Sequence, residues 1–183
     1  MSAFTFTPLS LPGLVLVETK RFEDPRGFFR MTWQASAFRA GGISDRFVQS
    51  NLSHSSRGTL RGLHYQKPPR AQGKLLAVLS GEVYDVAVDL RKGTPGFGKW
   101  EGVMLSAVNG RMLWVPEGFA HGFAVTSGEA EVLYLVTEEY APETDRGVRW
   151  DDPALGIPWP VAEPLLSEKD ARLPLLKDAD NPF

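Results

Sequence analysis

The sequence predicts a mainly β protein, and two observations favour this fold class. Between Phe47 and Tyr140 the chain is a series of short runs of branched and aromatic residues, interrupted by glycine about every ten residues, which is typical of a sandwich or barrel of short strands. In Glu82–Leu90 the side chains alternate with the period of two that belongs to a strand. Helix signals are confined to Gln34–Ala40 and to a short turn that opens near Ser167.

The elements can be justified in order along the chain. The segment Met1–Val17 is expected to form the first strand, because its apolar run Leu9–Val17 is broken by Ser10, Pro12 and Gly13 and therefore suits neither a signal peptide nor a membrane span. The remaining strands are expected at Thr59–Gln66, Leu75–Ser80, Glu82–Leu90, Gly102–Leu105, Arg111–Val115, His121–Thr126 and Glu131–Tyr140.

Asp85 and Asp89 share one face of the strand at Glu82–Leu90, and paired carboxylates on a solvated strand are usually polar surface. Of the two, only Asp85 is considered for the site. The chain becomes rich in proline from Pro153 onward, and this tail is expected to wrap the sheet. Residues 1–183 contain no internal repeat or long linker and are predicted to form a single domain.

Composition narrows the function. The absence of cysteine removes disulfides, thiolate catalysis and Cys-type metal sites, and it fits a reducing, cytoplasmic location. A net charge of −2 argues against a nucleic-acid partner, which demands a concentrated basic surface. No segment predicts membrane association. A small anionic ligand, in contrast, needs only a few local arginines.

Two of the three histidines lie in glycine-punctuated strand signatures. From Gly110 the chain runs Gly-Arg-Met-Leu-Trp-Val-Pro-Glu-Gly-Phe-Ala-His to His121, which resembles the second signature of the cupin superfamily. In the first cupin signature, Gly58, His64 and Gly81 hold the expected places. The resemblance implies a cupin-type double-stranded β-helix, or jelly roll, with a few short helices.

The metal ligands of the cupin pattern are missing. Gln66 stands where the second histidine belongs, and Lys74 stands close to the place of the glutamate. A catalytic divalent ion usually takes three or more protein ligands, and an ammonium group in the pocket would repel it. We therefore expect no metal and no other cofactor, and a pocket centred on His64 that is suited to proton transfer.

Six further segments narrow the resemblance to one family across nearly the whole chain. Their order and spacing are similar to the dTDP-4-dehydrorhamnose 3,5-epimerase family, and they are Arg26-Gly-Phe-Phe, Gln49-Ser-Asn51, Leu60-Arg61-Gly-Leu-His64, Gly73-Lys74, Pro116-Glu-Gly-Phe-Ala-His121-Gly-Phe and Leu166-Ser-Glu-Lys169-Asp170-Ala.

This resemblance implies an isomerase that inverts C3 and C5 of dTDP-4-dehydro-6-deoxy-D-glucose, giving dTDP-4-dehydro-L-rhamnose for dTDP-L-rhamnose biosynthesis. A base removes a proton next to the ketone, an enolate forms, and an acid returns a proton to the opposite face. By position in the family pattern, His64 is the base with Asp170 as its partner, Tyr134 is the acid, and Lys74 stabilises the enolate. The family forms dimers, often with exchanged amino-terminal strands, so a homodimer is expected.

The same resemblance implies a set of substrate-contact positions, and the arginines among them suit a diphosphate because a guanidinium offers forked, charged donors. These positions are Phe22, Arg26, Gln49, Asn51, Arg61, Lys74, His121, Asp145 and Lys169. The sequence departs from the family at Met31, where a substrate-contacting glutamate is usual, and at Glu139, where an aromatic pair with Tyr140 is common. Catalysis is expected to survive both changes. The preference for one nucleotide base in the substrate is expected to relax or change.

Each candidate also has a purely structural interpretation. His64 could be a core histidine, Asp170 could belong to a helix capping box with Ser167, Tyr134 could be a packed ring, and Lys74 could be a surface charge at a strand end.

Two arginines raise a question of placement. Arg26 could merely shape the turn at Asp24–Gly27. Strict alternation places Arg61 on the sheet face opposite His64, so that both reach one pocket only through a bulge at Gly62, a twist or a neighbouring subunit.

Rival functions follow from the same residues. A single-carbon epimerase or ketoisomerase of a related deoxysugar nucleotide would keep the fold. A metal-dependent cupin oxygenase or isomerase would use His64 and His121 as ligands. A non-catalytic sugar-binding or storage cupin would follow from the lost ligands alone.

Overall fold

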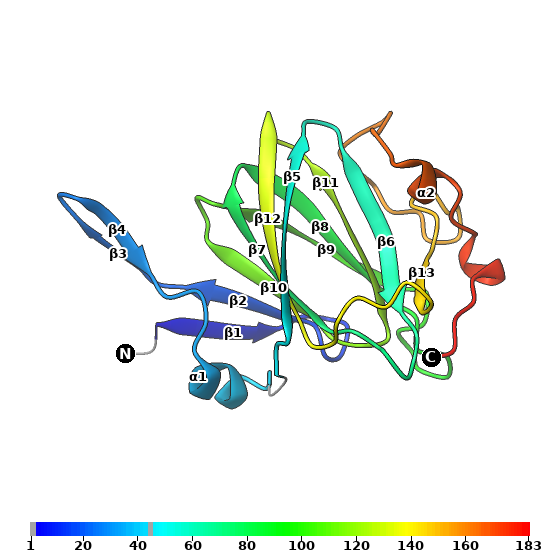
Figure 1. Cartoon of the computed structure of the whole chain (residues 1–183), viewed down its shortest axis with the longest axis horizontal. Coiled ribbons are helices and arrows are strands. Elements are labelled where there is room, and N and C mark those ends of the chain that lie inside the picture. Colours follow the sequence, from blue (N-terminus) through cyan, green and yellow to red (C-terminus); the bar gives the residue numbers. More distant parts are fainter. Residues whose placement is uncertain (1–2, 44–45) are drawn as a thin grey trace.

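The computed structural model describes residues 3–43 and 46–183 and consists of two antiparallel β-sheets that face each other (Figure 1). The six-stranded sheet has the order β1 (Phe4–Pro8), β2 (Val15–Thr19), β10 (Arg111–Val115), β7 (Lys74–Ser80), β12 (Glu129–Val136) and β5 (Gln49–Ser56). The five-stranded sheet has the order β13 (Asp145–Gly147), β6 (Leu60–Gln66), β11 (Phe119–Val125), β8 (Glu82–Asp89) and β9 (Trp100–Ser106). This arrangement confirms the mainly β prediction and the jelly-roll architecture.

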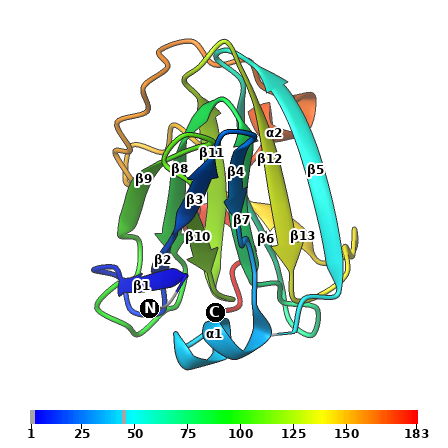
Figure 2. The same cartoon turned by 90° about the vertical axis from the view of Figure 1, so that its left-hand side faces the viewer.

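A separate hairpin, β3 (Arg21–Asp24) with β4 (Gly27–Arg30), extends away from the body of the molecule (Figures 1 and 2). The short helix α1 (Ala35–Ala40) follows it and begins after Gln34, as predicted. Near the carboxyl end lie α2 (Glu168–Ala171), which confirms the predicted turn after Ser167, and the 3-10 helix η1 (Leu176–Asp178). Among the described residues, no helix has the length and apolar character needed to cross a membrane.

The main core fills one end of the space between the two sheets. Its fully buried members include Leu76 and Val132 from one sheet and Val83, Ala87 and Phe123 from the other. Burying an aliphatic or aromatic side chain of this kind contributes about 1.5–3 kcal/mol to stability. The apolar faces of the strands thereby hold the two sheets together. At the opposite end of the space between the sheets, the inward-facing residues are polar and line a cavity.

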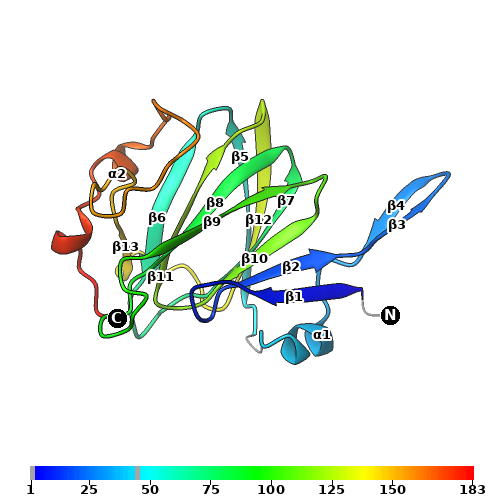
Figure 3. The same ribbon diagram turned by 180° about the vertical axis from the view of Figure 1, so that it is seen from behind.

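The tail after Pro153 covers the outer face of the five-stranded sheet, as predicted (Figure 3). Leu155 is buried in a cluster with Leu63 and Val88, and Phe183 packs edge-on against Tyr65. The tail therefore closes the second apolar face of this sheet and carries α2 back towards β6.

Several sequence-based boundaries were wrong. Leu9–Val17 is not one strand: a turn separates β1 from β2, because Leu9 N–H bonds to Leu14 O and closes the chain on itself. Met1 and Ser2 of the predicted first strand lie outside the described residues. The predicted strand at Glu131–Tyr140 ends at Val136, where the chain leaves the ladder, so Tyr140 lies in a loop.

The prediction that Asp85 and Asp89 form polar surface was also wrong. Both side chains are fully buried, because they share the face of β8 that carries Val83 and Ala87 into the core between the two sheets. Each carboxylate has a cationic or imidazole partner, Arg91 for Asp89 and His121 for Asp85.

A bulge in β6 brings Arg61 and His64 to the same side of the sheet. On β11, His121 pairs with His64 and Phe123 pairs with Arg61. These partners are two residues apart on β11 but three residues apart on β6, so β6 contains one extra residue. The extra residue is accommodated at Gly62, which has φ +117°, a conformation that favours glycine. The alternative of a bulge at Gly62 was therefore correct.

Candidate active site

A cavity of about 330 Å³ lies between the two sheets at the end not filled by the core. The six-stranded sheet contributes Asn51, Ser53, Lys74, Tyr134 and Val136, and the five-stranded sheet contributes Arg61, His64, Tyr65, Gln66, His121, Phe123 and Asp145. The loops and tail add Gln72, Tyr140, Ser167, Lys169 and Asp170. Most of the predicted site residues thus meet in one place.

His64 and Asp170 form a close imidazole–carboxylate pair in this cavity. Nε2 of His64 lies 2.6 Å from Oδ1 of Asp170, and the backbone N–H of Gly62 donates to Oδ2 at 3.4 Å. Asp170 is buried, and burial alone would raise the pKa of its carboxyl. Its hydrogen bond and charge interaction with His64, with help from Gly62 and Ser167, outweigh that effect and place the pKa of Asp170 below its usual value.

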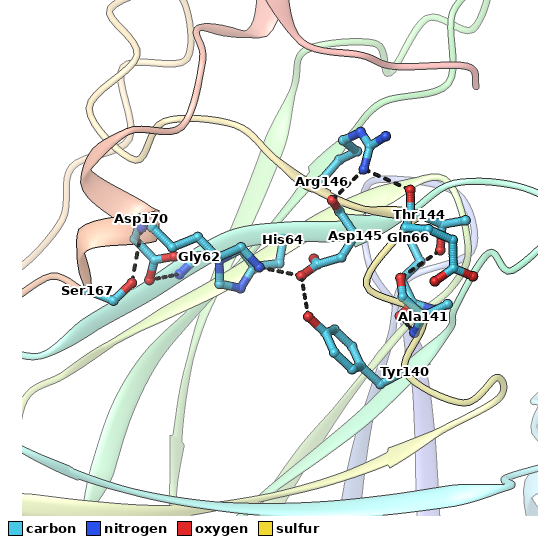
Figure 4. A network of polar contacts seen from close by, with 12 residues as sticks. Gly62, His64, Gln66, Tyr140, Ala141, Thr144, Asp145, Arg146, Ser167 and Asp170 are labelled. Carbon is cyan, nitrogen blue, oxygen red and sulfur yellow. Dashed lines mark hydrogen bonds and ion pairs between the residues drawn. The ribbon is translucent and has the colours of Figure 1, made fainter.

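The two interpretations of Asp170 turn out to be compatible. The Asp170 backbone N–H donates to Oγ of Ser167 at 3.0 Å, so Ser167 is the N-cap of α2. The Asp170 side chain remains free to face His64. Figure 4 shows Ser167, Gly62 and Asp170 together at this side of the cavity. The cap fixes the first turn of α2 and thereby the direction of the carboxylate.

The wall opposite His64 carries Lys74 and Tyr134. Lys74 Nζ donates a hydrogen bond to the backbone O of His64 at 3.2 Å. This hydrogen bond connects the two sheets. Burial lowers the pKa of Lys74 to about 8, although Asp145 and Asp85 act in the opposite direction. Burial also raises the pKa of Tyr134 well above its usual value, and the Tyr134 hydroxyl lies 3.4 Å from Oγ of Ser53.

His121 is buried at the floor of the cavity. Its Nε2 lies 3.0 Å from both carboxylate oxygens of Asp85 on the neighbouring strand. Its ring also lies edge-on to Tyr134, with 6.4 Å between centroids. From the sequence, Asp85 is only a weak candidate for the site. Its position on the same strand face as the apolar residues Val83 and Ala87 could have indicated that it points inward.

The mouth of the cavity holds a small polar network (Figure 4). The hydroxyl of Tyr140 donates to Oδ2 of Asp145 at 3.0 Å, and Lys169 forms a close ion pair with the same oxygen. Gln49 lies just outside, where it accepts from the Tyr140 N–H and donates to Asn51. Asp145, Lys169 and Asn51 were predicted; Tyr140 was noted only as part of a family difference.

Arg61 is held in the cavity wall by strand β5. Its Nε donates to Oγ of Ser55 at 2.9 Å and its guanidinium donates to the backbone O of His54 at 3.2 Å. These contacts fix the aliphatic stem of Arg61 and leave part of its forked donor set at the cavity surface. Ser53, Gln66, Gln72 and Phe123 also line the cavity and were missed as site residues, because polar or aromatic side chains on short strands give no distinctive sequence signal.

Three predicted substrate-contact residues do not line the cavity of their own chain: Gln49 lies just outside it, and the other two lie farther away. Phe22 and Arg26 lie in the β3–β4 hairpin, which extends away from the body (Figures 1 and 3). The Arg26 side chain bonds to Asp24 with its guanidinium 2.6 Å from Oδ2, so within one chain it shapes the turn. Met31 packs against the cluster around Phe38 and Trp114.

The described residues offer few groups that could coordinate a metal ion in this cavity. Within residues 3–43 and 46–183, no three His, Asp or Glu side chains gather closely enough to hold an ion. Gln66, at the place of a cupin ligand, instead bonds to the backbone of Arg70, Glu139 and Ala141. This residue therefore supports the loop at the cavity mouth.

Comparison with known proteins agrees with this geometry. The family model described as dTDP-4-dehydrorhamnose 3,5-epimerase matches residues 8–178. A relative from Shigella flexneri named dTDP-4-dehydrorhamnose 3,5-epimerase is 52% identical over 171 residues, which cover 93% of this chain and 94% of that protein. A dTDP-4-dehydrorhamnose 3-epimerase from Streptomyces niveus is 41% identical over 173 residues, which cover 94% and 84% of the two chains.

Among solved structures, dTDP-6-deoxy-D-glucose-3,5-epimerase RmlC from Legionella pneumophila, in complex with dTDP-4-keto-L-rhamnose, superposes with a TM-score of 0.91 and 47% identity, covering 95% of this chain and 93% of that one. The jelly roll with its polar inter-sheet cavity, together with these matches to named epimerases, identifies an isomerase of the cupin type. More narrowly, the chain belongs to the dTDP-4-dehydrorhamnose 3,5-epimerase family.

Proposed function

We propose that this epimerase inverts C3 and C5 of dTDP-4-dehydro-6-deoxy-D-glucose to give dTDP-4-dehydro-L-rhamnose, without a metal or other cofactor. The observation that carries the proposal is the placement of an imidazole–carboxylate pair and a buried tyrosine on opposite walls of one cavity. Inversion next to a ketone needs a base on one face of the sugar ring and an acid on the other, and this cavity offers both.

His64 is the base. Its Nε2 faces Asp170, while its Nδ1 has no hydrogen-bond partner among the described residues and is not an enclosed atom, so Nδ1 faces the cavity. Nδ1 takes the proton from C3 or C5, and the electron pair of the broken C–H bond moves towards the ketone oxygen. The Asp170 carboxylate stabilises the imidazolium that forms.

Lys74 stabilises the enolate. With a pKa of about 8, its ammonium group is mostly protonated at neutral pH and can donate a charged hydrogen bond to the anionic oxygen. The hydrogen bond from Lys74 to the His64 backbone keeps this cation beside the base. A donor of this kind, already in place before the reaction, needs little reorganisation as charge develops.

Tyr134 is the acid. Burial raises the pKa of its hydroxyl, so the group remains protonated at neutral pH and can give its proton to the enolate carbon. The carbonyl then re-forms and the carbon is inverted. The tyrosinate regains a proton from solvent, and His64 returns its own.

The remaining predicted residues bind the rest of the substrate, which comprises its sugar ring and its nucleotide diphosphate. Arg61 and Lys169 supply positive charge at the cavity wall and mouth, and Asn51, His121 and Asp145 supply hydrogen-bonding groups. We also propose a homodimer in which the projecting hairpin brings Phe22 and Arg26 to the partner's cavity. The exposed rings of Phe22, Phe28 and Phe29 on this hairpin support such a contact. The lack of cysteine supports a cytoplasmic setting.

The test is proton exchange. The chelator-dialysed protein is incubated with dTDP-4-dehydro-6-deoxy-D-glucose in D₂O, and deuterium entry at C3 and C5 is followed by NMR. Entry at both carbons with inversion is expected. Entry at C3 alone would mark a 3-epimerase, the activity named for the Streptomyces niveus relative. No entry at either carbon would refute the proposal.

A matched pair of histidine variants ties the result to the site. His64→Asn should lower exchange by about 10²–10⁴-fold, the usual contribution of a general base. His54→Asn is the control, because this side chain is exposed on β5 and lies outside the cavity. Equal losses in both variants would contradict the role given to His64.

A further inference from the structure

A second imidazole–carboxylate pair consists of His121, which lines the same cavity, and Asp85, which lies buried behind it; the pair has no role in the proton transfers above. Asp85 is fully buried, and His121 is only 4% exposed. His121 lies opposite Ala87 on β8, and Asp85 is two residues further along the same face, so the two side chains are diagonal neighbours. Both carboxylate oxygens lie 3.0 Å from His121 Nε2.

The two pairs are arranged alike. His64 and His121 are direct cross-strand partners on β6 and β11. In each pair Nε2 faces a buried carboxylate. Nδ1 of His121, like that of His64, has no hydrogen-bond partner within the described residues and is not one of their enclosed atoms. Two imidazole Nδ1 atoms therefore face the cavity side by side.

The Asp85 carboxylate interacts with the imidazole of His121 and with the ammonium group of Lys74. A buried carboxylate needs compensation, and Asp85 interacts electrostatically with the Lys74 ammonium group as well as with His121. Lys74 thus supplies the positive charge, and His121 need supply only an N–H. With its proton on Nε2, His121 presents a lone pair on Nδ1 to the cavity.

The two carboxylates that line this cavity within the described part of the chain are already engaged. The Asp170 carboxylate is engaged by His64 and Gly62, and the Asp145 carboxylate by Tyr140 and Lys169. The hydroxyl groups of a sugar ring donate hydrogen bonds to water. When the ring enters the cavity and loses this water, each hydroxyl group needs a protein acceptor to replace it.

We propose that Asp85 is a positioning residue that holds His121 in the tautomer with its proton on Nε2, so that Nδ1 accepts a hydrogen bond from a hydroxyl group of the substrate's sugar ring. Because His121 is adjacent to His64, this bond holds the ring over the base. The inference rests on the proposed function for the identity of the ligand, but the tautomer is a property of the free protein.

The first measurement uses the wild-type protein without substrate. The ¹⁵N chemical shifts of the His121 ring at pH 7, assigned by comparison with His121→Gln, report which nitrogen carries the proton. A protonated Nε2 and an unprotonated Nδ1 are expected. A proton on Nδ1 would overturn the proposal, whatever the enzyme's activity, and this result needs no destabilised variant.

The second measurement uses Asp85→Asn, whose amide can donate to Nε2 and so move the ring proton to Nδ1. We expect the ¹⁵N pattern to invert and KM to rise about tenfold or more, with kcat changed by less than about threefold, because a binding contact is lost. Unchanged KM together with an inverted tautomer would refute the acceptor role.

Asp89→Asn is the matched control. Asp89 is equally buried on the same face of β8, but its partner is Arg91 and not His121. Its variant should keep the His121 pattern and KM. A wild-type enzyme that shows the expected tautomer but no deuterium exchange would refute the proposed function while leaving the role of Asp85 in fixing the tautomer intact.

Discussion

Replacing Lys74 with methionine should make the protein more stable and nearly inactive at the same time. Methionine has a similar length and no charge, so it fills the same space. Burial lowers the pKa of Lys74 from 10.5 to about 8, so the folded state disfavours the ammonium form. At 1.36 kcal/mol per pKa unit, this difference is a cost of about 3 kcal/mol at neutral pH.

The variant also loses the hydrogen bond to the His64 backbone, which contributes about 1 kcal/mol. The net gain is therefore about 2 kcal/mol, or about 4–8 °C in Tm for a chain of this size. Loss of the enolate donor should reduce kcat by about 10²–10³-fold, as for the loss of an oxyanion-hole donor.

The pH dependence provides the check. Below pH 8 Lys74 is charged in both the folded and the unfolded state, and the whole penalty applies. Between pH 8 and pH 10.5 the unfolded state binds more protons, so the wild type gains stability as pH rises. Thermal unfolding of both proteins at pH 7 and pH 10.5 should show the advantage of methionine at the lower pH only. A lower Tm for the variant at pH 7, or a difference that does not change with pH, would refute the reasoning.

Three further outcomes are expected. Tyr134→Phe should still admit deuterium next to the ketone, while inversion slows by about 10²–10⁴-fold; equal loss of both by NMR would contradict its role as acid. The pH profile of kcat/KM should fall on the alkaline side at about pH 8, where Lys74 loses its proton, and Lys74→Arg should remove that limb. Gly62→Ala should cost about 3 kcal/mol in denaturant unfolding, because a Cβ there would lie 2.6 Å from the Gly122 backbone at φ +117°. Gly128→Ala, with open space around it, should be neutral.

Part of the site could be predicted from local signals, while Lys74, Tyr134 and Asp170 were assigned by resemblance to the family. His64 and His121 sit in strand signatures that glycine turns delimit, and the alternation of β8 shows in its side chains. The place of Arg61 depended on a single backbone conformation, and the glycine that permits it is visible in the sequence.

Other features depend on contacts between distant segments. β5 is polar and largely exposed, so its sequence carries no strand signal, and its ladder with β12 defines it. The burial of Asp85 follows from which strands cover β8, and the exposed loop position of Tyr140 follows from where β12 ends. Phe22 and Arg26 were assigned by resemblance, and the hairpin that carries them extends away from the body of its own chain.

The His64–Asp170 pair joins residues 106 positions apart in the chain. At a synthesis rate of about 10 residues per second, the carboxylate leaves the ribosome about ten seconds after the imidazole. During that interval the strand that carries the base exists without the group that orients it. A nascent or clipped chain that lacks α2 therefore also lacks the carboxylate that we propose stabilises the imidazolium of His64, and docking of the tail completes this pair.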